Sequence, residues 1–166
     1  MSEVTLADIR AARTELEGIA VRTPMEESRW LSALTGGTVR LKCENLQRTG
    51  SFKARGAYVR ISRLSAEEQA RGVVAASAGN HAQGVALAAQ LLGIRSTVFM
   101  PEGAPIPKEN ATRGYGADVI FHGAYLEDAL GAALAFAEET GETAQVKSRP
   151  GAPGGSEHPD DGAVGG

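Results

Sequence analysis

Short continuous runs of apolar residues alternate along the chain with longer stretches in which apolar residues recur at helical spacing. Three short, wholly or largely apolar runs predict buried strands, at residues 73–76, 96–100 and 118–121. Apolar residues at helical spacing predict the intervening and following helices, at about 80–92, 108–115 and 125–139. Strands and helices that alternate in this way form right-handed β-α-β units around a parallel sheet buried on both faces. We therefore expect an α/β fold in three layers, a parallel sheet with helices on both faces.

The N-terminal third shows weaker patterns. A first helix is expected after Thr5, a residue type that caps helix N-termini, and the period-two alternation over 38–44 predicts a strand. Ser51 is expected to cap a helix over 52–64, and Ser65 opens the next helix with a capping box. Trp30 is expected to pack an early helix against the sheet.

Residues 143–166 differ in composition from everything before them. The segment is rich in glycine and proline and has no Leu, Ile, Phe, Tyr or Trp, so burial cannot offset its ordering entropy. We expect a disordered tail. Because the change comes where another strand is due, we hypothesise a truncated or frame-shifted gene after about residue 142. Sequencing the coding DNA tests this, and the absence of an apolar strand in the other frames would contradict it.

Composition narrows the function. The 166 residues carry a formal net charge of -3 and few aromatic side chains, which disfavours nucleic-acid binding. The single cysteine, Cys43, forms no internal disulfide and no zinc site by itself, and no metal site is expected. No apolar run is long enough for a membrane span or a signal peptide. These features favour a cytoplasmic protein that does not enter membranes.

Two motifs carry candidate chemistry. Residues 51–57 place Lys53 at the start of a predicted helix, where a deprotonated amine can form a Schiff base with an aldehyde. Residues 77–84 enter a helix whose free N–H groups and positive dipole end suit a carboxylate. Taken alone, a lysine such as Lys53 is more often a solvated surface residue, the loop could be only a tight strand-to-helix turn, and His81 could be a histidine satisfied within the fold.

From about residue 23 to 142 the chain resembles the threonine dehydratase family of pyridoxal-phosphate enzymes, which have the tryptophan-synthase-β type of fold (fold type II). Several ordered motifs carry the resemblance, at residues 23–25, 41–47, 49–57, 76–85 and 111–117. The resemblance implies three regions: 1–52 as the N-terminal part of the large domain, 53–142 as a complete small α/β domain, and the tail 143–166. The large domain is then incomplete.

The resemblance also implies residue roles. Lys53 corresponds to the lysine that binds pyridoxal 5'-phosphate covalently and later moves the substrate α-proton. Phe52 corresponds to the residue beside the pyridine ring, and Asn80 to the one that hydrogen-bonds the phenolic oxygen. Ser77, Asn80 and His81 belong to the loop that binds the amino acid's carboxylate.

The implied reaction is β-elimination, in which L-threonine or L-serine loses water and ammonia to give a 2-oxo acid. Serine racemases of this family place a second serine where this chain has Ala78, so dehydration is favoured over racemisation. The family's glycine-rich phosphate loop lies beyond Glu142 and is not recognisable here, and we expect the chain alone to be inactive. The alternative is a non-catalytic α/β remnant that binds a small anion or a full-length partner. Association into a homo-oligomer is left open.

Overall fold

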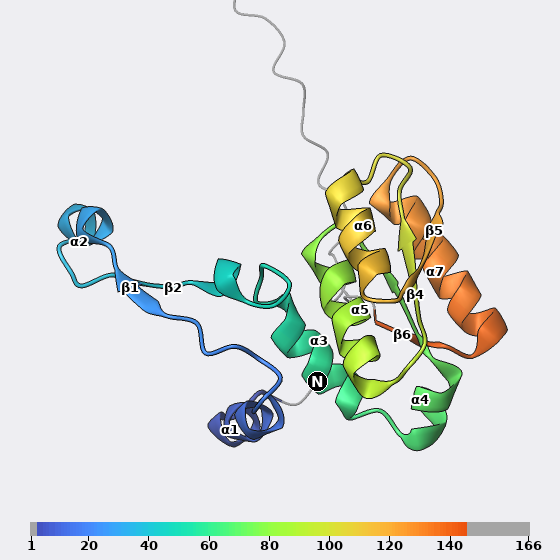
Figure 1. The fold of residues 1–166 in the computed structure, drawn as a ribbon, viewed down its shortest axis with the longest axis horizontal. Coiled ribbons are helices and arrows are strands. Elements are labelled where there is room, and N and C mark those ends of the chain that lie inside the picture. The colour runs from blue at the N-terminus through green and yellow to red at the C-terminus, as the bar shows by residue number, and fades with distance from the viewer. Residues whose placement is uncertain (1–2, 146–166) are drawn as a thin grey trace, which may run out of the picture.

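The computed structural model describes residues 3–145. Its centre is a four-stranded, wholly parallel sheet in the order β5-β4-β3-β6. The strands are β3 (Val73–Ala76), β4 (Ser96–Met100), β5 (Asp118–Phe121) and β6 (Thr143–Ala144). Helices α5 (Asn80–Leu92) and α6 (Ile106–Gly114) cover one face, and α7 (Leu126–Thr140) covers the other (Figure 1). This confirms the expected α/β fold, a parallel sheet between two helical layers.

The alternation of side chains along β3 explains why the strand is apolar throughout. Val73 and Ala75 pack with α5 and with α3 (Lys53–Ser62), whereas Val74 packs against α7. On the α7 side, the rings of Phe99 and Phe136 have centroids 5.5 Å apart. A strand buried on both faces needs apolar residues at every position, and this produces the continuous apolar runs seen in the sequence.

Helix boundaries follow the predicted capping residues closely. α5 ends at Gly93, which takes the left-handed conformation with φ 69°. α4 (Ala66–Arg71) begins after Ser65, whose predicted capping box is present. α3 starts one residue later than predicted because Phe52 occupies the N-cap position. Ser51 is therefore not the cap, although its Oγ accepts a 3.4 Å hydrogen bond from the N–H of Lys53.

The first residues of the expected tail are ordered. Thr143 and Ala144 pair in parallel with Val73 and Val74, and the N–H of Gln145 donates to the carbonyl of Val74 at 2.7 Å. Backbone pairing requires no large apolar side chain, so composition alone gave the wrong expectation for these three residues. The remainder of the expected tail, residues 146–166, lies outside the described residues.

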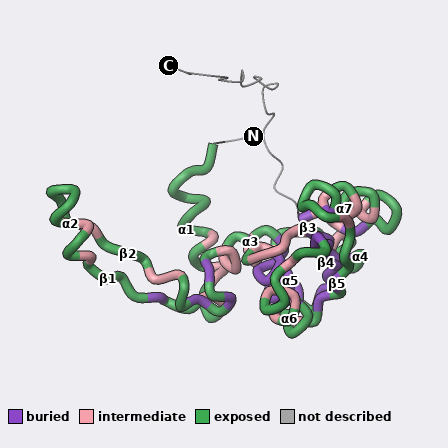
Figure 2. The backbone as a smooth tube through the Cα atoms, turned by 90° about the horizontal axis from the view of Figure 1, so that it is seen from above, coloured by how far each residue is buried: buried purple, intermediate pink, exposed green. Residues whose placement is uncertain are grey.

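Residues before α3 form an arm that extends from the α/β unit (Figures 1 and 2). It contains α1 (Leu6–Glu15), β1 (Met25–Glu27), α2 (Arg29–Thr35), β2 (Arg40–Lys42) and the short 3-10 helix η1 (Glu44–Leu46). The cap at Thr5 is confirmed, and the predicted strand corresponds to β2, which pairs antiparallel with the unpredicted β1. Trp30 is 73% exposed, so its predicted packing against the sheet is wrong.

Candidate active site

The strand order changes direction beside β3. Along the chain β4 and β5 are added on one side of β3, whereas β6 returns to its other side. In open α/β sheets, ligands bind outside the carboxyl ends of the strands at such a point. Ala76 ends β3, and Gln145 directly follows β6. Both residues line a cavity of about 390 Å³.

Four of the five predicted site residues meet in this cavity, which we call the lysine cavity. Its lining combines the start of α3, the loop after β3 and the first residue of α7, and consists of Phe52, Lys53, Gly56, Ala57, Arg60, Ala76, Ser77, His81, Leu126 and Gln145. A volume of this size is within the range of small-molecule sites, roughly 300 to 1,000 Å³. The structure therefore joins two sequence motifs into one concave site.

Lys53 enters the lysine cavity from the first turn of α3. Its Nζ lies 5.0 Å from the centroid of the Phe52 ring, within the range of a cation–π contact. The segment before it is anchored, since Thr49 and Ser51 are buried and the Thr49 hydroxyl donates to the Ser51 carbonyl at 3.4 Å. The amine thus projects from a backbone held on its N-terminal side.

Residues Ser77 to Gly79 connect β3 to α5, whose first two residues are Asn80 and His81. The N–H of Ser77 donates to the Phe99 carbonyl at 3.0 Å, and the Ser77 Oγ accepts from the N–H of Gly79 at 3.2 Å. Gly79 is the N-cap of α5 and offers no side-chain cap. The first N–H groups of α5 therefore lack a capping side chain and are suited to an anionic group.

His81 is tied to the strand that completes the sheet. Its Nε2 lies 2.7 Å from the carbonyl oxygen of Gln145. Because a carbonyl only accepts, Nε2 carries the proton and, in the neutral ring, Nδ1 is left as an acceptor. The buried Nε2 of Gln145 has no hydrogen-bond partner within residues 3–145. The loop and β6 are thus linked at the rim of the lysine cavity.

Asn80 is the predicted residue that the structure does not bring to the lysine cavity. Its Oδ1 instead accepts a 2.6 Å hydrogen bond from the Nζ of Lys108 at the start of α6. This contact occupies the amide oxygen and leaves the amide NH₂ as a donor. Its predicted role toward the phenolic oxygen of the cofactor stays a prediction.

Sequence reasoning missed several residues of the lysine cavity. Arg60 lies two helical turns after Lys53 on α3, so helical spacing could have found it. Leu126 and Gln145 line the cavity because the chain crosses from β5, at one edge of the sheet, back to β6 at the other edge. No local signal marks such long-range neighbours.

A partly buried ion pair holds the start of α3 against the preceding segment. The carboxylate of Glu44 accepts from Arg55 Nε at 2.7 Å, from Arg55 Nη2 at 2.8 Å and from the Thr23 hydroxyl at 2.6 Å. The Arg55 hydrogen bonds, aided by Thr23, lower the pKa of Glu44 from 4.5 to about 2. Arg55 follows Lys53 by two residues, so this pair also fixes the turn that carries the lysine.

The Glu44 carboxylate should make stability depend on pH. Its folded pKa lies below its ordinary value, so its stabilisation is present above pH 4.5 and is lost as the pH falls through about 2. We expect the stability advantage of the wild type over Glu44→Gln to shrink by at most about 3 kcal/mol across that window. Urea unfolding at several pH values measures it.

The matched control is Glu27→Gln. Glu27 lies 3.9 Å from Arg40 on the exposed surface, and this pair should contribute little. If the stability advantage of the wild type over Glu44→Gln stays constant as the pH falls, the assigned role of Glu44 is contradicted.

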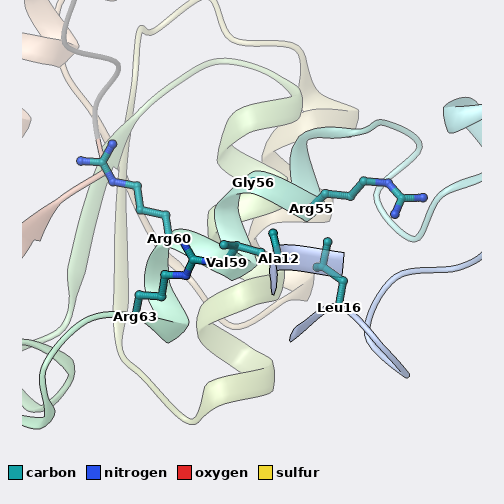
Figure 3. A pocket seen from close by; sticks show the side chains of 7 residues that line it. All are labelled: Ala12, Leu16, Arg55, Gly56, Val59, Arg60 and Arg63. Atoms are coloured by element: carbon teal, nitrogen blue, oxygen red, sulfur yellow. The ribbon is translucent and has the colours of Figure 1, made fainter. Parts of the chain in front are cut away.

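A second hollow, of about 510 Å³, lies between α1 and α3 (Figure 3). It is lined by Ala12, Leu16, Arg55, Gly56, Val59, Arg60 and Arg63. Two of its arginines are already paired, Arg55 with Glu44 and Arg63 with Glu15 at 2.7 Å. None of the predicted site residues lines this hollow, so we place the candidate site in the lysine cavity.

Residues 3–145 contain neither a cluster of metal-ligating side chains nor a membrane-spanning helix. In this part of the chain no three His, Cys, Asp or Glu side chains gather closely enough to hold a metal ion. No helix in the same range combines the length and apolar character needed to cross a bilayer.

The geometry defines a class: an α/β protein that brings a lysine and the uncapped N-terminus of a helix together at the switch point of a parallel sheet. Residues 16–151 match the model of the family described as "Pyridoxal-phosphate dependent enzyme". The match covers well over half of the chain, and the chain belongs to this family.

Individual relatives and solved structures agree. The chain is 55% identical over 138 residues to an L-threonine ammonia-lyase of Thermotoga maritima, covering 83% of this chain and 34% of the relative. It is 52% identical over 136 residues to an L-threo-3-hydroxyaspartate ammonia-lyase of a Pseudomonas species, covering 82% and 43%. The structure of maize serine racemase matches with a TM-score of 0.79 and 36% identity, covering 86% and 44%. The chain therefore spans between about a third and somewhat under half of the length of these proteins.

Proposed function

We propose that this chain serves pyridoxal-phosphate-dependent ammonia-lyase chemistry, the β-elimination of water from L-threonine or L-serine followed by loss of ammonia. The observation that carries the proposal is the meeting of Lys53 with the loop Ser77–His81 in one cavity at the carboxyl ends of β3 and β6. The relatives named as ammonia-lyases support the reaction class. The non-catalytic alternative has no comparable support.

The residues of the lysine cavity fit the cofactor. Lys53 offers a primary amine of the kind that reacts with the cofactor's aldehyde, and the exposed ring of Phe52 lies beside it. Asn80 does not line the cavity, but its amide NH₂ is left as the donor that the proposed hydrogen bond to the phenolic oxygen would need. The bound cofactor supplies an electron sink for the negative charge that develops at the substrate Cα.

The chain's own residues would bind the amino acid and move its proton. The uncapped N–H groups at the start of α5, with Ser77, would hold the substrate carboxylate. The Lys53 amine, on one side of the site, would take the Cα proton. Ala78 has no hydroxyl to return a proton from the opposite side, which favours elimination over racemisation.

The domain roles are part of the same proposal. Within residues 3–145, all three clusters of buried core residues lie between residues 57 and 133, so 53–142 is proposed as the small α/β domain, to whose sheet Thr143 and Ala144 add β6. Residues 1–52 bury little within the described structure and are proposed as the N-terminal part of the large domain. We also propose a cytoplasmic location, supported by the lone cysteine, Cys43.

Proton exchange at the substrate Cα tests the proposal. The chain with pyridoxal phosphate in D₂O should exchange the Cα proton of L-serine or L-threonine faster than the cofactor alone, and should leave the D-isomers unchanged. Proton NMR measures the exchange, which is only the first step of the reaction; full turnover to a 2-oxo acid is not expected of the chain alone. Equal exchange with and without the chain would contradict the proposal and favour the non-catalytic alternative.

A further inference from the structure

Helices α3 and α5 approach each other closely beside Lys53. Gly84 lies in the second turn of α5 and is buried. A Cβ built on Gly84 would lie 3.1 Å from both the carbonyl carbon and the carbonyl oxygen of Lys53, and 3.3 Å from the nitrogen of Ala54. Ordinary contacts between non-bonded carbon atoms are roughly 3.5 to 4.0 Å. A side chain at position 84 therefore requires the backbone of Lys53 to move.

The backbone conformation of Gly84 does not require glycine. It has the negative φ of an ordinary helical residue, and glycine in a helix interior is less stable than alanine by about 1 kcal/mol. Gly131 in α7, by contrast, has nothing within 4 Å of its virtual Cβ. The close approach to Lys53 is the feature of position 84 that glycine alone accommodates.

The first turn of α3 cannot simply retreat as a rigid unit. One turn further along, Ala57 and Ile61 are buried against Val85 and Ala88 of α5. On the other side, Thr49 and Ser51 are themselves buried. A Cβ at position 84 would therefore tilt or shift the first turn while the rest of α3 stays packed.

We infer that Gly84 is a positioning residue for Lys53, setting the distance between the lysine-bearing turn of α3 and the loop that opens α5. This inference rests on the proposed function of Lys53. α5 carries His81 in its first turn, directly after the loop, and one turn later Gly84 lies against the Lys53 backbone. One helix thus places both halves of the site.

The test is the Gly84→Ala variant of the full chain, with labelling resolved by lysine. Each protein is incubated with pyridoxal phosphate and reduced with borohydride, and the label on Lys53 relative to Lys42 is measured by peptide mass spectrometry. Since displacements near 1 Å can cost about 100-fold, a shift of a few tenths of an ångström should lower the Lys53 ratio about fivefold. Gly131→Ala should leave the ratio unchanged.

Two controls separate position from stability. Val85→Ala removes buried volume from the same helix contact without approaching the Lys53 backbone, so it should lose stability but keep the Lys53 ratio. Circular dichroism confirms that each variant is folded. If Gly84→Ala is only partly folded, the comparison is made in sucrose, which favours the compact state. An unchanged ratio in folded Gly84→Ala overturns the inference.

A second reagent distinguishes a failure of the proposed function from a failure of the inference about Gly84. If wild-type Lys53 shows no preference for pyridoxal phosphate over Lys42, the proposed function is contradicted. Gly84 is then judged by acetic anhydride, whose rate of reaction with Lys53 relative to Lys42 reports the amine's surroundings without the cofactor. A changed rate ratio in Gly84→Ala supports the positioning role, and an unchanged one overturns it.

Discussion

Replacing Lys53 with alanine is expected to abolish retention of pyridoxal phosphate by the chain after gel filtration, measured by the absorbance of the bound cofactor. Lys53 contributes the amine of the lysine cavity, so its loss removes the covalent bond to the aldehyde. The remaining contacts are non-covalent. We expect cofactor retention to fall by at least about 100-fold, because a positioned amine captures the aldehyde far more effectively than an amine in solution.

Two variants control this result. Lys53→Arg keeps a cation that can lie over the Phe52 ring but has no amine to form a Schiff base, and it should lose the cofactor as Lys53→Ala does. Lys42→Ala removes an exposed lysine of β2 and should retain the cofactor normally. Equal retention by wild type and Lys53→Ala would mean that binding does not use this amine.

Arg55→Ala is expected to lower the free energy of unfolding by about 2 to 3 kcal/mol. Removing one partner of a fully buried ion pair costs about 3 to 5 kcal/mol, and the loss here should be smaller because Arg55 is partly exposed. The variant leaves the Glu44 carboxylate, whose side chain is 15% exposed, without its two charge-assisted hydrogen bonds. Urea unfolding at pH 7 measures the loss. The first turn of α3 should loosen as well.

A double-mutant cycle separates the ion pair from lost packing. Adding Glu44→Gln to Arg55→Ala removes the unpaired charge and should restore part of the stability. Arg40→Ala breaks an exposed 3.9 Å contact with Glu27 and should change stability by less than about 0.5 kcal/mol. Equal losses for Arg55→Ala and Arg40→Ala would contradict the anchoring role of Arg55.

The α/β core was predictable because its signals are local. Residues 73–76 are apolar at every position since both faces of β3 are covered, and the structure confirms this strand. The end of α5 was predictable because Gly93 adopts a positive φ that glycine favours. In both cases the signal lies in the residues of the element itself or directly beside it.

Other elements depend on partners far along the chain. β6 forms because its backbone pairs with β3, for which the side chains of Thr143 and Ala144 give no signal. Trp30 has a side chain typical of a core, yet it lies on an arm in which, among the described residues, no hydrophobic side chain is buried. Composition therefore underestimated the order of residues 143–145, and the residue type of Trp30 overestimated its burial.

The candidate site was predictable only in part. The motifs containing Lys53 and Ser77 were recognisable in the sequence, and the structure brings these two residues to one cavity. The partners of the loop side chains, Lys108 for Asn80 and Gln145 for His81, are distant in sequence and had no local signature. Tertiary contacts, rather than motif spacing, determine which polar atoms remain free.

The first measurement to make is the distribution of reduced pyridoxyl label among the lysines of the wild-type chain. The chain is incubated with substoichiometric pyridoxal phosphate, reduced with borohydride and mapped by peptide mass spectrometry. If Lys53 is the cofactor lysine, most of the label is found on Lys53, although Lys42 is more exposed. A label spread over the lysines according to their exposure would contradict the assignment of the lysine cavity as the cofactor site.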